Sequence, residues 1–141
     1  MIRVDQILML GQNAVVRKVV AKSDAAGNYS SGLQELLATP SCIDMIIRAA
    51  VDAVDKHLPE GYVTVGLSVD FSHDLPTSLG MTVNVKAALT EIHGKRLLFK
   101  ISAWDELGEV GHGKHERMVV EREEILKKAK DRAKFLVQRT F

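Results

Sequence analysis

The sequence has 141 residues, of which 26% are charged, with a single cysteine and a formal net charge of +1. This length suits one domain over residues 1–141. The small net charge gives no electrostatic reason to expect binding to nucleic acid or to an anionic membrane. The lone cysteine excludes an internal disulfide. Because no apolar run approaches the roughly 20 residues of a membrane span and the N-terminus lacks the apolar core of a signal peptide, we expect a soluble cytoplasmic protein.

The first part of the chain predicts one strand and one loop. Residues 2–22 are rich in Val, Ile and Leu and are interrupted by Gly11, which predicts a strand broken by a bulge or bend. Residues 23–32 are small and polar, a composition typical of a loop. Because this loop shortly precedes Thr39 it is a candidate lid, although a plain connection is the more common role for such a segment.

Residues 39–57 predict an apolar helix. Pro40 suits the first turn, where its missing N–H is not needed, and the hydroxyl of Thr39 can cap the exposed amides. Charged residues recur every four positions with alternating sign, which favours ion pairs along one stripe; they are Asp44, Arg48, Asp52 and Lys56. The rest of the circumference is apolar or small, so we expect other elements to wrap around this helix.

Residues 62–73 predict a strand with one buried face. Apolar residues alternate there with small or polar ones; the apolar set is Val63, Val65, Leu67, Val69 and Phe71. His73 is in phase with this set. We therefore expect its imidazole to point towards the helix and to approach the hydroxyl of Thr39.

The second half of the chain predicts antiparallel strands followed by a helix. Alternation over residues 81–92 and 97–103, on either side of a tight turn at 93–95, indicates a hairpin, and residues 110–120 form a last strand. From Glu121 onward the charges change from acidic to basic, as the helix dipole favours. Apolar side chains of this helix can dock on the sheet; they are Ile125, Leu126, Ala129, Ala133 and Leu136.

The order of these elements predicts an α+β fold. An antiparallel sheet would curl around one central helix, with a further helix at the C-terminus, which is the hot-dog architecture. Four or five strands leave open sheet edges. Open edges favour the pairing of two copies.

Short motifs occur along nearly the whole chain in a recognisable order. They are Leu37-Ala38-Thr39-Pro40, Thr64-Val65-Gly66, His73, Gly80-Met81-Thr82-Val83 and the run of residues 111–117. Together these motifs resemble those of the hot-dog thioesterases similar to fluoroacetyl-CoA thioesterase. The resemblance implies a homodimer or larger oligomer that hydrolyses an acyl-CoA at sites on the subunit interface. It implies no separate cofactor, because coenzyme A is part of the substrate.

The same resemblance implies roles for individual residues. Thr39 and His73 stand at catalytic positions, Gly66 matches a glycine near the thioester carbonyl, and Arg117 matches an arginine that could face the CoA phosphates. One position departs from the family. Its acid lies two helical turns after the threonine, where this chain has Ile47, and an isoleucine can neither attack a thioester nor orient water.

The departure at Ile47 leaves three functions open. The first is an acyl-CoA thioesterase in which His73 is the base for an attacking water, Thr39 holds substrate or water, and backbone N–H groups stabilise the oxyanion. The second is a non-catalytic acyl-CoA-binding module, which Ile47 favours. The third is an acyl-CoA dehydratase, which needs a histidine and carboxylate pair that the sequence does not place.

The candidate residues also have purely structural explanations. Thr39 can be an N-cap, and His73 can be a satisfied core histidine. Asp44, the nearest replacement acid, fits a solvated surface charge, and Cys42 fits a small buried apolar residue.

The histidines of the last strand do not predict a metal site. His112 and His115 fall on opposite faces of a strand, so one ion cannot use both, and Glu116 does not change this. Gly111 and Gly113 more simply allow close approach of backbone or ligand.

Overall fold

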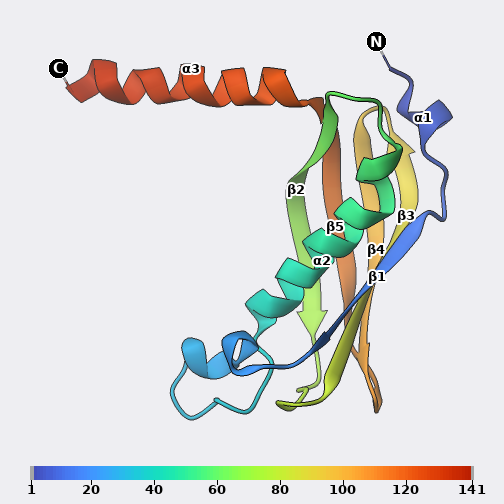
Figure 1. Ribbon diagram of the computed structural model, residues 1–141, viewed down its shortest axis with the longest axis vertical. Helices are drawn as coiled ribbons and strands as arrows, with labels where there is room; N and C mark the ends of the chain where they lie inside the picture. The colour runs from blue at the N-terminus through green and yellow to red at the C-terminus, as the bar shows by residue number, and fades with distance from the viewer. Residues whose placement is uncertain (1, 141) are drawn as a thin grey trace.

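A computed structural model describes residues 2–140, with side chains for residues 2–136. The elements, in chain order, are α1 (Val4–Ile7), β1 (Asn13–Val19), the 3₁₀ turns η1 (Lys22–Asp24) and η2 (Ala26–Asn28), α2 (Thr39–Val54), η3 (Asp55–His57), β2 (Tyr62–His73), β3 (Thr82–His93), β4 (Arg96–Asp105), β5 (Gly108–Glu121) and α3 (Arg122–Thr140). The five strands form one antiparallel sheet in the order β1-β3-β4-β5-β2. This sheet curls around α2, which confirms the predicted α+β plan (Figure 1).

The core lies between α2 and the concave face of the sheet. The helix buries seven side chains, Cys42, Met45, Ile46, Ala49, Ala50, Ala53 and Val54, and the central strands supply Val83, Val85, Ala87, Leu89, Leu97, Phe99 and Ile101. Three alanines on the helix let its backbone approach the sheet closely, and burial of these apolar surfaces is the main stabilising term.

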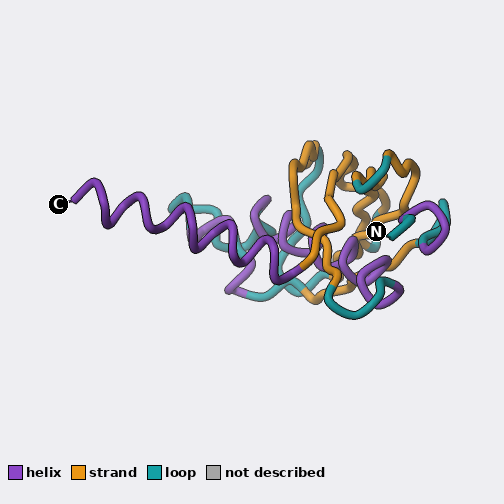
Figure 2. Tube along the Cα trace, turned by 90° about the horizontal axis from the view of Figure 1, so that it is seen from above, coloured by secondary structure: helices purple, strands orange, loops and turns teal. Residues whose placement is uncertain are grey.

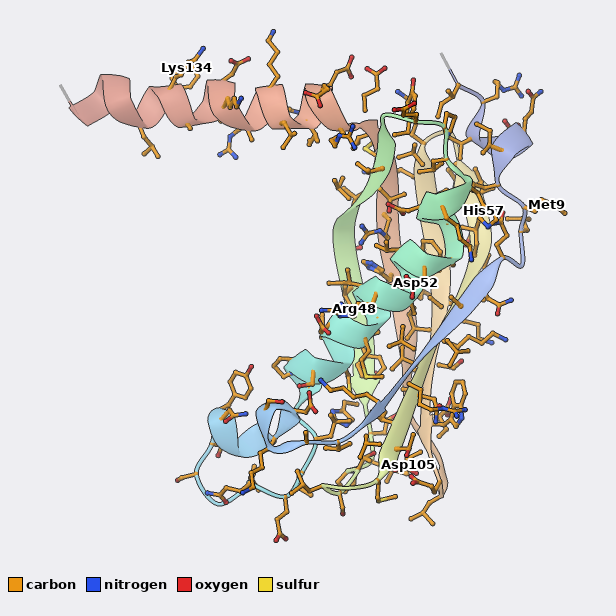
Figure 3. The ribbon with its side chains drawn as sticks, viewed as in Figure 1. Met9, Arg48, Asp52, His57, Asp105 and Lys134 are labelled. Atoms are coloured by element: carbon orange, nitrogen blue, oxygen red, sulfur yellow. The ribbon has the colours of Figure 1, made fainter. Side chains whose placement is uncertain are left out.

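The helix is wrapped on one side only. Its outer face carries Asp44, Arg48 and Asp52 in solvent, together with Ile47, whose exposed fraction is 38%. Figure 3 shows Arg48 and Asp52 on the side of α2 that faces away from the sheet. The predicted wrapping is confirmed on the side of α2 that faces the curled sheet, whereas the stripe of charged residues stays in solvent.

The N-terminal segment is not one long strand. Residues 4–7 form the single turn α1, and β1 begins only at Asn13. Gly11 lies between them with a φ of +94°, a conformation that side chains disfavour. The backbone therefore turns at the position where the sequence predicts a bend.

Strand β2 contains a β-bulge that the sequence did not indicate. Its pairing with β5 matches Gly66 with Arg117 and Ser68 with Glu116, which leaves Leu67 as an extra residue. Thr64 is buried before the bulge, whereas Val69 and Phe71 pack on the core after it. The prediction that the residues from Val63 to Phe71 share one face is wrong, because one extra residue inverts the alternation.

Helix α3 projects away from the body of the protein. Figures 1 and 2 show it extending from the end of β5 as an isolated rod, and Leu126 and Phe135 are 50% and 64% exposed. The prediction that α3 docks on the sheet is therefore wrong. The physical reason is that α3 follows Glu121 directly, with no loop to turn the chain back. Within the described residues, no helix has the length and apolar character to cross a membrane.

Candidate active site

The hydroxyl of Thr39 and the imidazole of His73 meet at the N-terminus of α2. Oγ1 of Thr39 lies 2.8 Å from Nδ1 of His73. The N-cap position is occupied by Ala38, and Thr39 is the first helical residue, so its hydroxyl does not cap the helix. The capping interpretation is therefore wrong.

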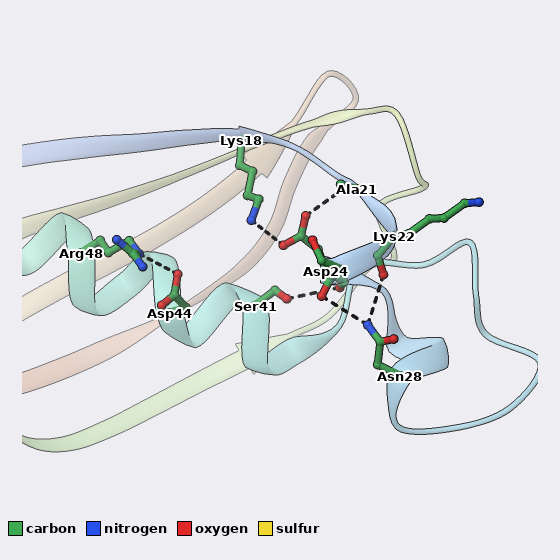
Figure 4. A network of polar contacts seen from close by, with 9 residues as sticks. Lys18, Ala21, Lys22, Asp24, Asn28, Ser41, Asp44 and Arg48 are labelled. Carbon is green, nitrogen blue, oxygen red and sulfur yellow. Dashed lines mark hydrogen bonds and ion pairs between the residues drawn. The ribbon is translucent and has the colours of Figure 1, made fainter.

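A buried aspartate fixes the start of α2. Asp24 accepts a hydrogen bond from the Ala21 amide at 2.9 Å and pairs with Nζ of Lys18 at 2.6 Å (Figure 4). Its backbone carbonyl accepts the Ala38 amide at 2.7 Å and the Ser41 hydroxyl at 3.3 Å. The segment before α2 is thus an ordered connection that holds the residue preceding Thr39. No sequence motif identified Asp24, because two of its partners, Ala38 and Ser41, lie beyond the loop that follows it.

His73 ends β2 with one ring nitrogen engaged and the other unpaired. Nε2 is buried, and among the described side chains it is the one buried N or O atom without a hydrogen-bond partner. Burial lowers the pKa of His73 below its ordinary value of 6.5, while the Asp74 charge and the backbone of Leu75 oppose this shift. At pH 7 the imidazole is therefore neutral and can accept a proton.

A cavity of about 240 Å³ adjoins His73. Its walls come from residues 26, 36 and 37 on one side and residues 73–76 on the other. A bridge between Ala25 and Leu37 and another between Leu36 and Ser78 hold the first wall in place. The lining is apolar apart from His73 and Asp74, so a small acyl group is a chemically suitable occupant.

Ile47 brings no polar group to this site. It lies two helical turns after Thr39, on the exposed face of α2. The nearest acid along the helix, Asp44, accepts a hydrogen bond from Nε of Arg48 at 2.8 Å and is exposed. This confirms the prediction that Asp44 is a solvated partner of Arg48.

Gly66 of β2 and Arg117 of β5 are paired across the β2–β5 ladder, at a position that precedes His73 in β2. A Cβ added to Gly66 would meet nothing closer than Nη1 of Arg117, at 3.4 Å. Arg117 is 5% exposed and donates from Nε and Nη2 to Thr64, at 2.8 Å each. Three of its five N–H groups have protein partners when its 3.2 Å contact with His115 is included. Its contact with CoA phosphates stays a prediction.

The remaining candidates have structural roles. Burial raises the pKa of Cys42 to about 11, so its thiol is unreactive at neutral pH. A Cβ at Gly113 would come within 2.0 Å of the Asp70 carbonyl, and one at Gly111 within 2.5 Å of Phe71. These glycines therefore permit close approach of β2. In the described part of the chain, no group of three or more His, Cys, Asp or Glu residues is arranged to hold a metal ion.

Comparison with known proteins places the chain in a family. Residues 20–123 match the family described as fluoroacetyl-CoA-specific thioesterase. The fluoroacetyl-CoA thioesterase of Streptantibioticus cattleyicolor is 33% identical over 98 residues, which are 70% of each chain.

Solved structures agree with this match. A hot-dog-like protein from Thermanaerovibrio acidaminovorans superposes with a TM-score of 0.86 at 29% identity, covering 91% of this chain and 95% of its own. A mutant of the fluoroacetyl-CoA-specific thioesterase FlK superposes with a TM-score of 0.80 at 26% identity, covering 89% and 97%. The predicted hot-dog fold is confirmed, and the chain belongs to the fluoroacetyl-CoA-specific thioesterase family.

Proposed function

We propose that this protein is an acyl-CoA thioesterase in which His73 is the general base and Thr39 its hydroxyl partner. The observation that carries the proposal is the 2.8 Å contact between Thr39 and His73, in a histidine that lines a cavity and whose Nε2 is buried and unpartnered. A buried ring nitrogen without a partner is costly unless a substrate or a water molecule uses it. Membership of the family supports the same chemistry.

The reaction requires one tautomer of His73. When Nδ1–H donates to Oγ1 of Thr39, Nε2 carries the lone pair and is the ring nitrogen left to accept a proton. A water molecule attacks the thioester carbonyl carbon as Nε2 takes its proton. The tetrahedral intermediate then breaks its C–S bond, and the imidazolium returns the proton to the CoA thiolate. The products are a carboxylic acid and free CoA, and no separate cofactor is needed.

Charge develops on the carbonyl oxygen during this reaction. Backbone N–H groups at the N-terminus of α2 or near Gly66 are the proposed donors, because preorganised amides stabilise an oxyanion strongly in a dry site. Gly66 offers backbone without a side chain, and in this chain no contact forces a glycine there. We assign Gly66 to close approach of the thioester.

The complete site belongs to a homodimer in this proposal. Both β1 and β2 are edge strands with unpaired backbone groups, and α2 leaves Ile47 exposed beside its charged stripe. Pairing of two copies would cover these surfaces and place the partner next to the substrate.

Ile47 favours a second candidate function, a non-catalytic acyl-CoA-binding module. The side chain stands two turns from Thr39 and brings no acid to the Thr39–His73 pair. A module of this kind would bind acyl-CoA without releasing thiol.

One experiment separates the two functions. Hydrolysis is measured with a free-thiol reagent across acyl-CoAs of increasing length and polarity, and binding of the same esters is measured by calorimetry. A thioesterase releases CoA catalytically from at least one short acyl-CoA, and His73→Ala abolishes that release. Binding without turnover on every ester would contradict the proposal and support the module. His93→Ala is the matched control, because His93 is exposed in the β3–β4 hairpin and pairs with Glu91.

A further inference from the structure

Strand β2 would bury different side chains if it were regular. A regular strand paired with β5 at His73 would put Val63, Val65 and Leu67 on the inner face, following the alternation of the sequence. Thr64 and Gly66 would then face outward. The bulge at Leu67 inverts the alternation upstream, so Thr64 and Gly66 instead share the inner face with His73.

Two buried residues of β5 hold the two sides of this bulge. Upstream, Arg117 donates to Oγ1 and to the carbonyl oxygen of Thr64, at 2.8 Å each. Downstream, Nδ1 of His115 lies 2.8 Å from the carbonyl oxygen of Ser68. Nη1 of Arg117 and Nε2 of His115 are 3.2 Å apart, which joins the two halves into one network.

The network fixes the protonation of its members. A guanidinium only donates and a carbonyl only accepts, so Nε2 of His115 accepts from Arg117 and Nδ1–H donates to Ser68. Burial lowers the pKa of His115, and the positive charge of Arg117 adds to this, although the bond to Ser68 opposes it. Every hydrogen bond in the network is thus satisfied with His115 neutral.

A carboxylate completes the network on the helix side. Oδ1 of Asp55 accepts the Thr64 hydroxyl at 2.6 Å, and Oδ2 accepts the Thr64 amide at 3.2 Å. Because Asp55 directly follows α2, the orientation of Thr64 is tied to the helix as well as to β5. On the outer face of the sheet, the Thr64 hydroxyl would lose its bonds to Asp55 and Arg117.

We propose that His115 and Arg117 form a clamp that holds the bulge at Leu67 and thereby keeps Gly66 on the same face of β2 as His73. Both are positioning residues. The clamp opposes the regular register, which the alternating apolar sequence of β2 favours. The inference depends on the proposed function only for the idea that Gly66 and His73 contact the same substrate. The bulge and its hydrogen bonds do not depend on the proposed function.

A thiol reporter tests the clamp without measuring activity. Val65→Cys places a thiol on the outer face while the bulge is held and on the inner face if the strand becomes regular. Met118→Cys is the matched control, because Met118 pairs with Val65 on the regular strand β5. The native thiol of Cys42 is buried with a pKa raised to about 11 and labels slowly.

Substitutions of His115 give opposite expectations. His115→Leu removes both ring nitrogens, so labelling of the Val65→Cys thiol should slow by about tenfold or more as that residue turns inward. Labelling of the Met118→Cys thiol should not change. His115→Asn keeps an N–H donor near the position of Nδ1, and it should restore fast labelling of the Val65→Cys thiol.

Deletion of Leu67 makes the clamp dispensable. Without the extra residue the strand is regular, and Thr64, Gly66 and His73 still face inward. In the variant that lacks Leu67, adding His115→Leu should leave labelling of the Val65→Cys thiol unchanged. If His115→Leu does not fold in the full-length strand, deletion of Leu67 should restore the folded protein. The clamp is overturned if His115→Leu folds with wild-type labelling, or if it is unfolded and the deletion does not rescue it.

Hydrolysis measured on the same variants separates this inference from the proposed function. If both hold, kcat/KM falls in His115→Leu and recovers when Leu67 is also deleted. If the wild type hydrolyses no acyl-CoA but the labelling pattern changes as expected, the clamp stands and the proposed function fails. A lower melting temperature without any change of labelling would overturn the clamp.

Discussion

Thr39 and His73 lie 34 residues apart in the sequence and 2.8 Å apart in the structure. One begins the central helix and the other ends the strand that follows it, so the contact depends on the whole α2–β2 unit. This pair is the basis of the first two predictions.

Removal of the base should abolish most of the activity. His73→Ala should lower kcat by about 10²-fold or more, the scale of general-base loss. Thr39→Ala should also slow hydrolysis, because Nδ1 loses the partner that sets the tautomer, whereas Thr39→Ser keeps the hydroxyl and should retain most of the rate. Steady-state thiol release measures all three. Wild-type turnover by His73→Ala would refute the mechanism.

Acid should lower both the activity and the stability. Burial lowers the pKa of His73 below 6.5, so kcat/KM should be flat above that lowered pKa and should fall as the pH drops through it. The pKa of His115 is lowered for the same reason. In the unfolded chain both histidines regain ordinary pKa values and bind more protons, so the free energy of unfolding should decrease as the pH falls from 6.5 towards the lowered values. Rate profiles and urea titrations at several pH values check the two signs. An acid limb centred above pH 6.5 would contradict the assignment of His73.

Gly66 should be dispensable for folding but not for turnover. A Cβ there meets no atom closer than 3.4 Å, and the backbone φ is not positive. Gly66→Ala should therefore change the free energy of unfolding by less than about 1 kcal/mol, while the methyl group obstructs the thioester and lowers kcat/KM. Gly113→Ala is the contrasting variant, since its Cβ would overlap the Asp70 carbonyl and should prevent normal folding. Full activity in Gly66→Ala would remove this residue from the site.

A carboxylate at position 47 should increase the rate. Ile47 is 38% exposed in the single chain, so Ile47→Glu buries its charge only where the partner copy covers position 47. The new carboxylate would stand two helical turns after Thr39, at the position where the resemblance implies an acid, and faster acyl-CoA hydrolysis is expected. Ile47→Gln has nearly the same shape without the charge and should give no gain. If a folded Ile47→Glu protein is no faster and the wild type is already fast, another residue supplies the acid, and Asp44 is the next to test.

The protein should be a dimer in solution. The chain mass is 15.6 kDa, so sedimentation at micromolar concentration should report about twice that value. A monomer that still hydrolyses acyl-CoA would show that one copy contains a complete site.

The sequence by itself determined the elements that depend on local pattern. The period of the apolar residues identified α2 and the four long strands, and Pro40 identified the helix start, because side-chain periodicity is imposed by the geometry of a single element. The sequence alternation also predicted that His73 lies on the same face of β2 as Val69 and Phe71, because no bulge lies between Val69 and the end of β2.

Only the tertiary structure decided the features that need partners from distant segments. The bulge at Leu67 follows from bonds that Thr64 and Ser68 make with β5, and these override a regular alternation in the sequence. Asp24 holds the start of α2 through its contacts with Lys18 and Ala38, and the sequence around residue 24 does not predict these contacts. Helix α3 projects away from the sheet because it follows β5 without a loop. The spacing of its apolar residues does not predict this direction. Hydrogen bonds between elements are set by three-dimensional proximity, and in this protein they determine which side chains of β2 face the candidate site.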